Sequence, residues 1–188
     1  MRNQEYLIAL GGNLPSGAGQ PAQTLEAALA DIAAEGVAVL AVSRFYDTPC
    51  FPAGAGPDYV NAAAWLRCDL EPDALLDLLH RIEAKHGRQR AQRWGMRTLD
   101  LDLLAAGDLV MPDAAAQTAW RELPPDAQSR TMPDRLILPH PRLQDRAFVL
   151  VPLVDIAPDW VHPLTGLSVA QMCAALPDAA RAEVRPKQ

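Results

Sequence analysis

The sequence has few cysteines and no long apolar run, and each absence removes a class of protein. Its three cysteines, Cys50, Cys68 and Cys173, are far apart and form no CxxC pair, so we expect neither a disulfide framework nor a zinc site. A reducing compartment, the cytoplasm, fits best. The longest apolar stretches, such as 148–154, are too short to cross a bilayer, and the first residues do not resemble a signal peptide. We therefore expect no membrane association.

Basic charge is also scarce. The net charge is −6 and the pI is about 5.1, whereas a duplex-binding protein usually carries a basic face, so we expect no nucleic-acid partner. About half of the 188 residues are apolar (49%), enough to bury a sizeable core in one domain. We find no repeat of solenoid length. The prediction is a single domain over 1–188 with a long inserted loop at about 108–134, acting as a monomer.

Hydrophobic periodicity predicts a regular order of elements. Strands are expected at 6–10, 37–46, 59–66 and 98–104, and helices at 24–34 and 72–86. The segment 59–66 fits a strand or a helix by composition, but its aromatic and β-branched ends and the Pro-rich loop before it favour a strand. The order β-α-β-β-α-β is typical of a ferredoxin-like α+β fold, an antiparallel sheet with helices on one face.

The second half of the chain is less regular. Residues 108–134 contain four prolines and no sustained periodicity, which indicates an exposed loop with a short helix around 114–121. Loops of this length are usually functional or disordered. An apolar segment at 147–156 and a short helix at 168–175 then form a C-terminal extension.

Two aspartates carry the clearest chemical signal. Asp100 and Asp102 are two residues apart in a predicted strand, so their side chains point to one face, while Leu99, Leu101 and Leu103 point to the other. Paired carboxylates repel each other unless a cation lies between them, and hard oxygen ligands with room for water suit Mg²⁺. A bare pair of this kind is more often a solvated strand face, and that alternative stays open at this point.

A basic loop precedes the aspartates. Arg88, Arg90, Arg93 and Arg97 follow Gly87, and guanidinium groups bind phosphate oxygens in a bidentate manner. Arginines beside paired carboxylates suit a metal–triphosphate site, although a merely solubilising loop has the same composition. Trp94 in this loop could stack on a flat ring or simply pack.

Two further segments are ambiguous when taken alone. The flanking prolines of Pro139-His140-Pro141 present His140 rigidly, so it could donate to a phosphate, but a structural histidine is the commoner case. Gly11-Gly12-Asn13 permits close approach of a ligand to the backbone. It lacks the full GxGxxG or Walker pattern, so an ordinary turn is favoured.

Taken together, the motifs resemble the 6-hydroxymethyl-7,8-dihydropterin pyrophosphokinase family of folate biosynthesis. They occur in the family's order as Ile8–Leu14, Ser43–Pro49, Pro57–Ala63, Ile82-Glu83 with Gly87-Arg88, Arg93–Asp102, and Leu138–Pro141 with Arg146 and Phe148. The element Arg-Thr-Leu-Asp-Leu-Asp is the most specific of these. The resemblance implies a ferredoxin-like fold and transfer of pyrophosphate from ATP to the pterin hydroxymethyl group, with release of AMP.

The resemblance also implies a role for each matching position. Asp100 and Asp102 would hold two Mg²⁺ ions and form the catalytic set with Arg88 and Arg97. The ATP contacts would be Glu83, Arg88, Arg97, Leu103, Arg135, His140 and Arg146. The pterin contacts would be Thr48, Phe51, Tyr59, Asn61, Trp94 and Phe148. No general base is evident; Asp102 and a metal-bound water are candidates.

Some positions depart from the family pattern. Met96 stands where many members have proline, Pro141 replaces a tyrosine, Ile137 replaces a threonine, and the stretch 108–134 is longer than usual. Two other functions stay open: a non-catalytic ferredoxin-like nucleotide-binding module, and another DxD metal-dependent phosphate-ester transferase. The pterin-lining residues Tyr59 and Asn61 favour the pyrophosphokinase, because neither alternative needs them.

Overall fold

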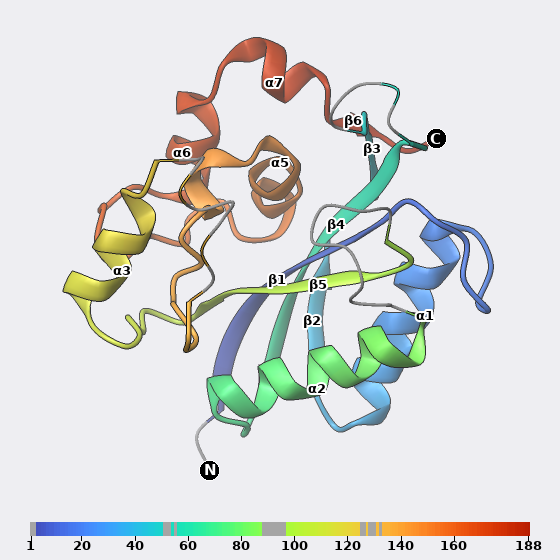
Figure 1. The fold of residues 1–188 in the computed structure, drawn as a ribbon, viewed down its shortest axis with the longest axis horizontal. Coiled ribbons are helices and arrows are strands. Elements are labelled where there is room, and N and C mark those ends of the chain that lie inside the picture. The colour runs from blue at the N-terminus through green and yellow to red at the C-terminus, as the bar shows by residue number, and fades with distance from the viewer. Residues whose placement is uncertain are drawn as a thin grey trace.

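The computed structural model describes residues 3–50, 54, 56–87, 97–124, 127, 131 and 133–188 (Figure 1). The strands are β1 (Gln4–Gly12), β2 (Ala38–Val42), β3 (Tyr46–Thr48), β4 (Tyr59–Cys68), β5 (Asp100–Ala106) and β6 (Arg185–Pro186). The helices are α1 (Pro21–Ala34), α2 (Pro72–Lys85), α3 (Ala114–Arg121), α5 (Ala147–Ile156), α6 (Val169–Ala175) and α7 (Asp178–Ala182), with a 3₁₀ turn at Leu143–Asp145.

The sheet confirms the ferredoxin-like prediction. Its order is β5-β1-β4-β3-β6, with β2 also paired to β4, and the pairings within it are antiparallel. The expected strand over 37–46 is instead two short strands, because β2 pairs with the end of β4 and β3 with its beginning. Ser43 lies at the break and still bonds to β4: its Oγ accepts from the Ala63 N–H (2.9 Å).

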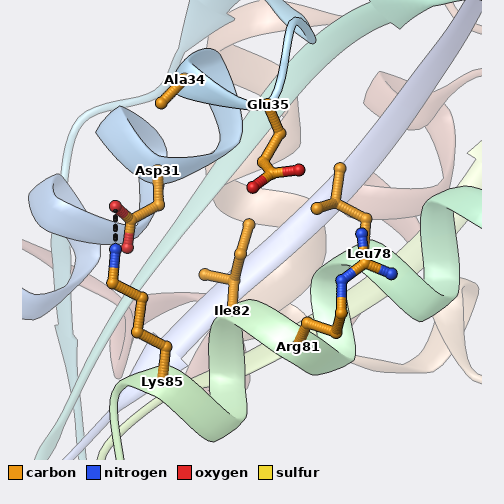
Figure 2. A pocket seen from close by; sticks show the side chains of 7 residues that line it. All are labelled: Asp31, Ala34, Glu35, Leu78, Arg81, Ile82 and Lys85. Carbon is orange, nitrogen blue, oxygen red and sulfur yellow. Dashed lines mark hydrogen bonds and ion pairs between the residues drawn. The ribbon is translucent and has the colours of Figure 1, made fainter.

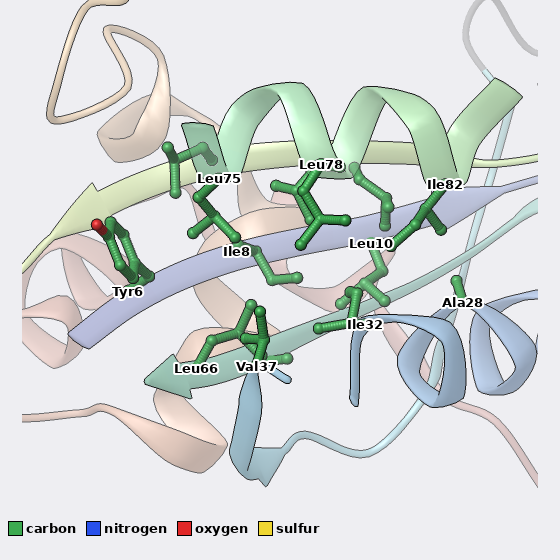
Figure 3. Close-up of a cluster of buried hydrophobic side chains, with 14 of the residues drawn as sticks. Tyr6, Ile8, Leu10, Ala28, Ile32, Val37, Leu66, Leu75, Leu78 and Ile82 are labelled. Carbon is green, nitrogen blue, oxygen red and sulfur yellow. The ribbon is translucent and has the colours of Figure 1, made fainter. Parts of the chain in front are cut away.

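One face of the sheet is covered by α1 and α2. In α2, apolar residues recur at helical spacing, so the stripe formed by Leu75, Leu78, Leu79 and Ile82 is buried. Figure 3 shows Leu75, Leu78 and Ile82 meeting side chains of β1 and α1 in one cluster that includes Tyr6, Ile8, Leu10, Ala28 and Ile32. Leu99, Leu101 and Leu103 belong to the same cluster, as predicted.

The other face is covered by the C-terminal extension. Small side chains at Ala9 and Ala63 let α5 approach the sheet, where Leu150 and Leu153 are fully buried. The C-terminal helices lie together, away from α1 and α2 (Figure 1). A polar clamp fixes α5 to the edge of the sheet: Asp155 accepts from Arg44 Nη2 and from the Tyr46 hydroxyl, each at 2.8 Å.

The long stretch between β5 and His140 contains the short helix expected there. Asp113 caps α3 by accepting from the Ala116 N–H at 2.9 Å. Met111 and Leu138 exchange two backbone hydrogen bonds of 2.9 and 3.1 Å, so the chain leaves the domain and returns to it at neighbouring points. Among the residues whose structure is described, no helix combines the length and apolar character needed to cross a membrane.

Candidate active site

Asp100 and Asp102 open β5 on the α5 side of the sheet. Their side chains are 22% and 35% exposed, while the intervening Leu101 is buried against the α1 and α2 face. The Leu101 N–H donates to Glu83 Oε1 at 2.7 Å, which ties β5 to the end of α2 between the two aspartates. The alternation predicted from the sequence is therefore confirmed, and both carboxylates are accessible.

Two arginines pair with these carboxylates. Arg97 forms an ion pair with Asp100, and Arg146 Nη1 lies 3.8 Å from Asp102 Oδ2. Burial acts to lower the pKa of Arg97, but the neighbouring Asp100 and Asp102 outweigh it and raise the pKa. For Arg146 burial dominates and lowers the pKa, and Asp102 only partly offsets it. The result is a compact set of alternating charges that could exchange partners with an anionic ligand and its cation.

His140 lies in the electrostatic field of this set. Burial, followed by Arg146, lowers the pKa of His140 to about 3, with Asp100 acting in the opposite direction. Its Nδ1 accepts from the Arg142 N–H at 3.1 Å, which assigns the proton of the neutral ring to Nε2. Nε2 is then a neutral donor, suited to a phosphate oxygen.

We expect the His140 ring to stay neutral from pH 8 to pH 5. Because the folded pKa is lowered, stability linked to His140 is complete above the unfolded pKa of about 6.5 and is lost as the pH falls toward the folded value. Side-chain ¹⁵N NMR of histidine-labelled protein, with the signal assigned through His140→Gln, measures this directly. A titration midpoint near 6.5 would contradict a half-buried ring that stays neutral.

Three of the residues expected to bind the pterin, Thr48, Tyr59 and Asn61, lie in β3 and β4 on the sheet face that carries the aspartates. Asn61 pairs in register with Gly11, and Gly11 pairs with Asp100, so the Cα atoms of Asp100 and Asn61 are about 10 Å apart. Asn61 is 6% exposed, and its Nδ2 donates to Thr48 Oγ1 at 2.6 Å. Tyr59 is the cross-strand partner of Thr48, and burial raises the pKa of its hydroxyl.

Positions 11 and 12 need glycine because neighbouring atoms leave too little room for a Cβ. A Cβ on Gly11 would lie 2.7 Å from Asn61 Oδ1, and one on Gly12 would lie 2.6 Å from the Thr98 carbonyl oxygen. The missing side chain at Gly11 leaves room for the Asn61 amide, whose Oδ1 lies over Gly11. Gly11 and Gly12 end β1 and do not form a turn, so the turn interpretation favoured for this segment misses a steric requirement of the sheet.

Asn13 is a further residue whose importance the sequence did not indicate. It is 2% exposed; its Oδ1 accepts from the Arg97 N–H at 2.9 Å, and its Nδ2 donates to the Pro57 carbonyl at 3.0 Å. Asn13 therefore joins the segment entering β5 to the segment entering β4. The signal that could have found it is its place directly after two glycines at the end of a buried strand.

The remaining residues expected to contact ATP or the pterin differ in how accessible their side chains are. Glu83 and Leu103 are buried, so contact between Leu103 and a ligand would involve its main chain. Phe148 is 39% exposed, and the Arg146 guanidinium lies 5.7 Å from the centre of its ring. Arg135 pairs with Asp134 and lines a hollow beside α3. Phe51, Arg88 and Trp94 lie outside the described residues, as do Arg90, Arg93 and Met96.

The carboxylate pair suits Mg²⁺ better than a metal that needs a full protein cage. Across the described ranges, no cluster of three or more His, Cys, Asp or Glu residues could hold a metal ion. Mg²⁺ keeps several waters and is commonly held by one or two carboxylates together with substrate phosphates. Asp100 and Asp102, both partly exposed, fit that description.

A separate hollow lies between α1 and α2, on the face away from the aspartates (Figure 2). An ion pair closes one side of it, where Lys85 Nζ lies 2.7 Å from Asp31 Oδ1. Lys85, followed by His86, lowers the pKa of Asp31. The described residues that line this hollow include none of those expected to bind ATP, pterin or metal, so it is not the candidate active site.

The fold and site define a ferredoxin-like α+β domain with a carboxylate–arginine centre on the same sheet face as a buried polar pair, Asn61 and Thr48. The model of the 7,8-dihydro-6-hydroxymethylpterin-pyrophosphokinase (HPPK) family matches residues 7–158, and the chain belongs to this family.

Three curated relatives match the chain over most of their own length. The chain is 39% identical to a 2-amino-4-hydroxy-6-hydroxymethyldihydropteridine pyrophosphokinase of Pseudomonas aeruginosa over 176 residues, 93% of either chain. It is 39% identical to the Synechocystis enzyme of that name, over 88% of this chain and 73% of that one, and 38% identical to the Haemophilus influenzae enzyme, over 83% of each.

Solved structures support the fold alone. A chain of Plasmodium falciparum HPPK-DHPS superposes with a TM-score of 0.64 at 14% identity, and the match covers 92% of this chain. This chain spans only 44% of that solved chain.

Proposed function

We propose that the chain transfers pyrophosphate from ATP to the hydroxymethyl group of 6-hydroxymethyl-7,8-dihydropterin and releases AMP, a step of folate biosynthesis. The observation that carries this proposal is the row Asp100–Gly11–Asn61 across three strands. It puts a centre of paired charges at one end and a buried amide at the other, with a glycine, which has no side chain, between them. Membership of the pyrophosphokinase family supports it.

The ATP side is formed by residues that neutralise and orient phosphates. Arg97 and Arg146 would exchange their carboxylate partners for phosphate oxygens, and the neutral His140 would donate through Nε2. Pyrophosphate transfer needs in-line positioning and charge stabilisation more than covalent chemistry. Groups that are already fixed and partly desolvated supply both without reorganising during the reaction.

Mg²⁺ belongs to this proposal as the cation between the carboxylates and the phosphates. Asp100 and Asp102 would hold it, with two ions expected, and when bound it would offset the charge of the triphosphate. Without it, the two carboxylates would repel the triphosphate.

The pterin side is formed by polar groups recessed into the sheet. The pterin is flat and rich in hydrogen-bonding groups, and recognition of such a ring needs a slot with a few fixed polar partners. Asn61, held by Thr48, would contact the polar edge of the ring. Tyr59 and Phe148 would flank the ring, with Phe51 and Trp94 expected to complete the slot.

We further propose a cytoplasmic location, because Cys50, Cys68 and Cys173 are all free thiols, as a reducing compartment allows. The expectation of a monomer stays a prediction that sedimentation would check.

The test is a product analysis. Purified protein with Mg²⁺, ATP and 6-hydroxymethyl-7,8-dihydropterin should form AMP in step with pterin pyrophosphate, and either substrate alone should give little product. Formation of ADP would indicate a different phosphate-ester transferase. AMP formed without pterin would mean that the acceptor is wrong, and ATP binding with no turnover would favour the non-catalytic nucleotide-binding module.

A further inference from the structure

We infer that Gln117, in α3, is a positioning residue. It fixes the turn Pro139–Pro141, which would present His140 to ATP. This inference rests on the proposed ATP-binding role of His140. It gives α3, in the stretch between β5 and His140, a defined part in the enzyme.

The observation is that the buried side-chain amide of Gln117 donates a hydrogen bond to this turn. Gln117 is 0% exposed, and its Nε2 donates to the Pro139 carbonyl oxygen at 3.0 Å. Burying an amide is unfavourable unless it is hydrogen-bonded, and Gln117 Oε1 has no partner among the residues that the structure describes. An apolar side chain would therefore fill this position at lower cost. What the amide contributes is the bond to Pro139.

Two backbone hydrogen bonds hold the rest of the turn. The His140 N–H donates to the Leu104 carbonyl at 2.8 Å, and the Leu143 N–H donates to the His140 carbonyl at 3.0 Å. Leu104 is two residues beyond Asp102 on β5, so the first bond sets His140 relative to the carboxylates. Gln117 holds the peptide on the N-terminal side of His140, which limits how the ring can tilt.

The helix that carries Gln117 is itself anchored. Asp113 caps its first turn, and the Met111–Leu138 bridge joins the two ends of this stretch one residue before Pro139. These contacts connect β5 to α3, and α3 to the turn at His140, through residues that the structure describes.

The experiment compares Gln117→Met with Ala119→Met. Met removes the donor while keeping similar bulk, and Ala119 lies on the exposed side of the same helix. With Mg²⁺ and a non-hydrolysable ATP analogue, we expect Gln117→Met to weaken nucleotide affinity about 3- to 10-fold. Pterin affinity should not change, and Ala119→Met should change neither affinity. If Gln117→Met gives no cooperative thermal transition, Gln117→Leu supplies the same comparison.

A double variant decides whether Gln117 acts through His140. If it does, Gln117→Met combined with His140→Ala should bind the analogue no more weakly than His140→Ala alone. Additive losses, or equal losses for nucleotide and pterin with a lower melting temperature, would reduce Gln117 to a structural role and overturn the inference. If His140→Ala weakens nucleotide binding and Gln117→Met does not, the inference fails while the proposed function stands. A His140→Ala variant with normal affinity would remove its basis, although AMP formation would still test the proposed function separately.

Discussion

Replacing Asp100 or Asp102 with asparagine should lower kcat/KM for pyrophosphate transfer by at least about 10²- to 10³-fold. Asparagine has nearly the same size, so what is removed is charge and metal affinity. Both side chains are partly exposed, at 22% and 35%, and neither belongs to the apolar clusters on the two faces of the sheet. We therefore expect the variants to fold, with activity lost by a much larger factor than stability.

The metal role gives these variants a second, more specific signature. Without Mg²⁺, the carboxylates repel the triphosphate, so each asparagine variant should bind ATP no more weakly than the unaltered protein. With Mg²⁺ each variant should bind ATP more weakly than the unaltered protein, because it holds the cation less well. Calorimetric titration of a non-hydrolysable ATP analogue with and without Mg²⁺ measures both conditions.

A matched control for these measurements is Asp108→Asn, an exposed acid just beyond β5, which should change neither turnover nor nucleotide affinity. Near-normal turnover in both Asp100→Asn and Asp102→Asn would rule out the metal role. Equal weakening of ATP binding with and without Mg²⁺ would instead indicate that the carboxylates act by holding Arg97 and Arg146 in place.

Local patterns predicted most of the fold. The stripe on α2 and the alternation around Asp100 follow from side-chain periods of 3.6 and 2, which depend only on neighbouring residues. The same rule put Asp100 and Asp102 on one accessible face and Leu101 on the buried one. The short helix between β5 and His140 also followed from local composition, since α3 has the bounds that were expected.

Long-range register set the features that the sequence did not reveal. The break between β2 and β3 arises because each strand pairs with a different part of β4. The requirement for glycine at position 11 depends on Asn61, fifty residues away. The joining role of Asn13 depends on Arg97 and Pro57. No local pattern contains these partners, so a turn was the natural interpretation of Gly11-Gly12-Asn13.

The register also defines a variant that should damage one half of the site. In Gly11→Ala the new Cβ would lie 2.7 Å from Asn61 Oδ1, closer than packed atoms allow. Asn61 is 6% exposed and bonded to Thr48, so its amide must turn away from the position proposed to contact the pterin. Losing that contact, and leaving the pterin's partner group unpaired, should raise the KM for pterin about 10- to 100-fold.

A rise in the KM for pterin without an equal rise in the KM for ATP would distinguish this effect from a general loss of stability. Overpacking costs about 1–3 kcal/mol of stability, so thermal melts must accompany the kinetics. Gly17→Ala is the matched control, because a Cβ there meets no atom within 4 Å. If the damage passes through Asn61, the double variant Gly11→Ala/Asn61→Ala should have a pterin KM no higher than Asn61→Ala alone. An unchanged pterin KM in Gly11→Ala, or an equal rise in the KM for ATP, would show that the Asn61 amide over Gly11 does not belong to the pterin half of the site.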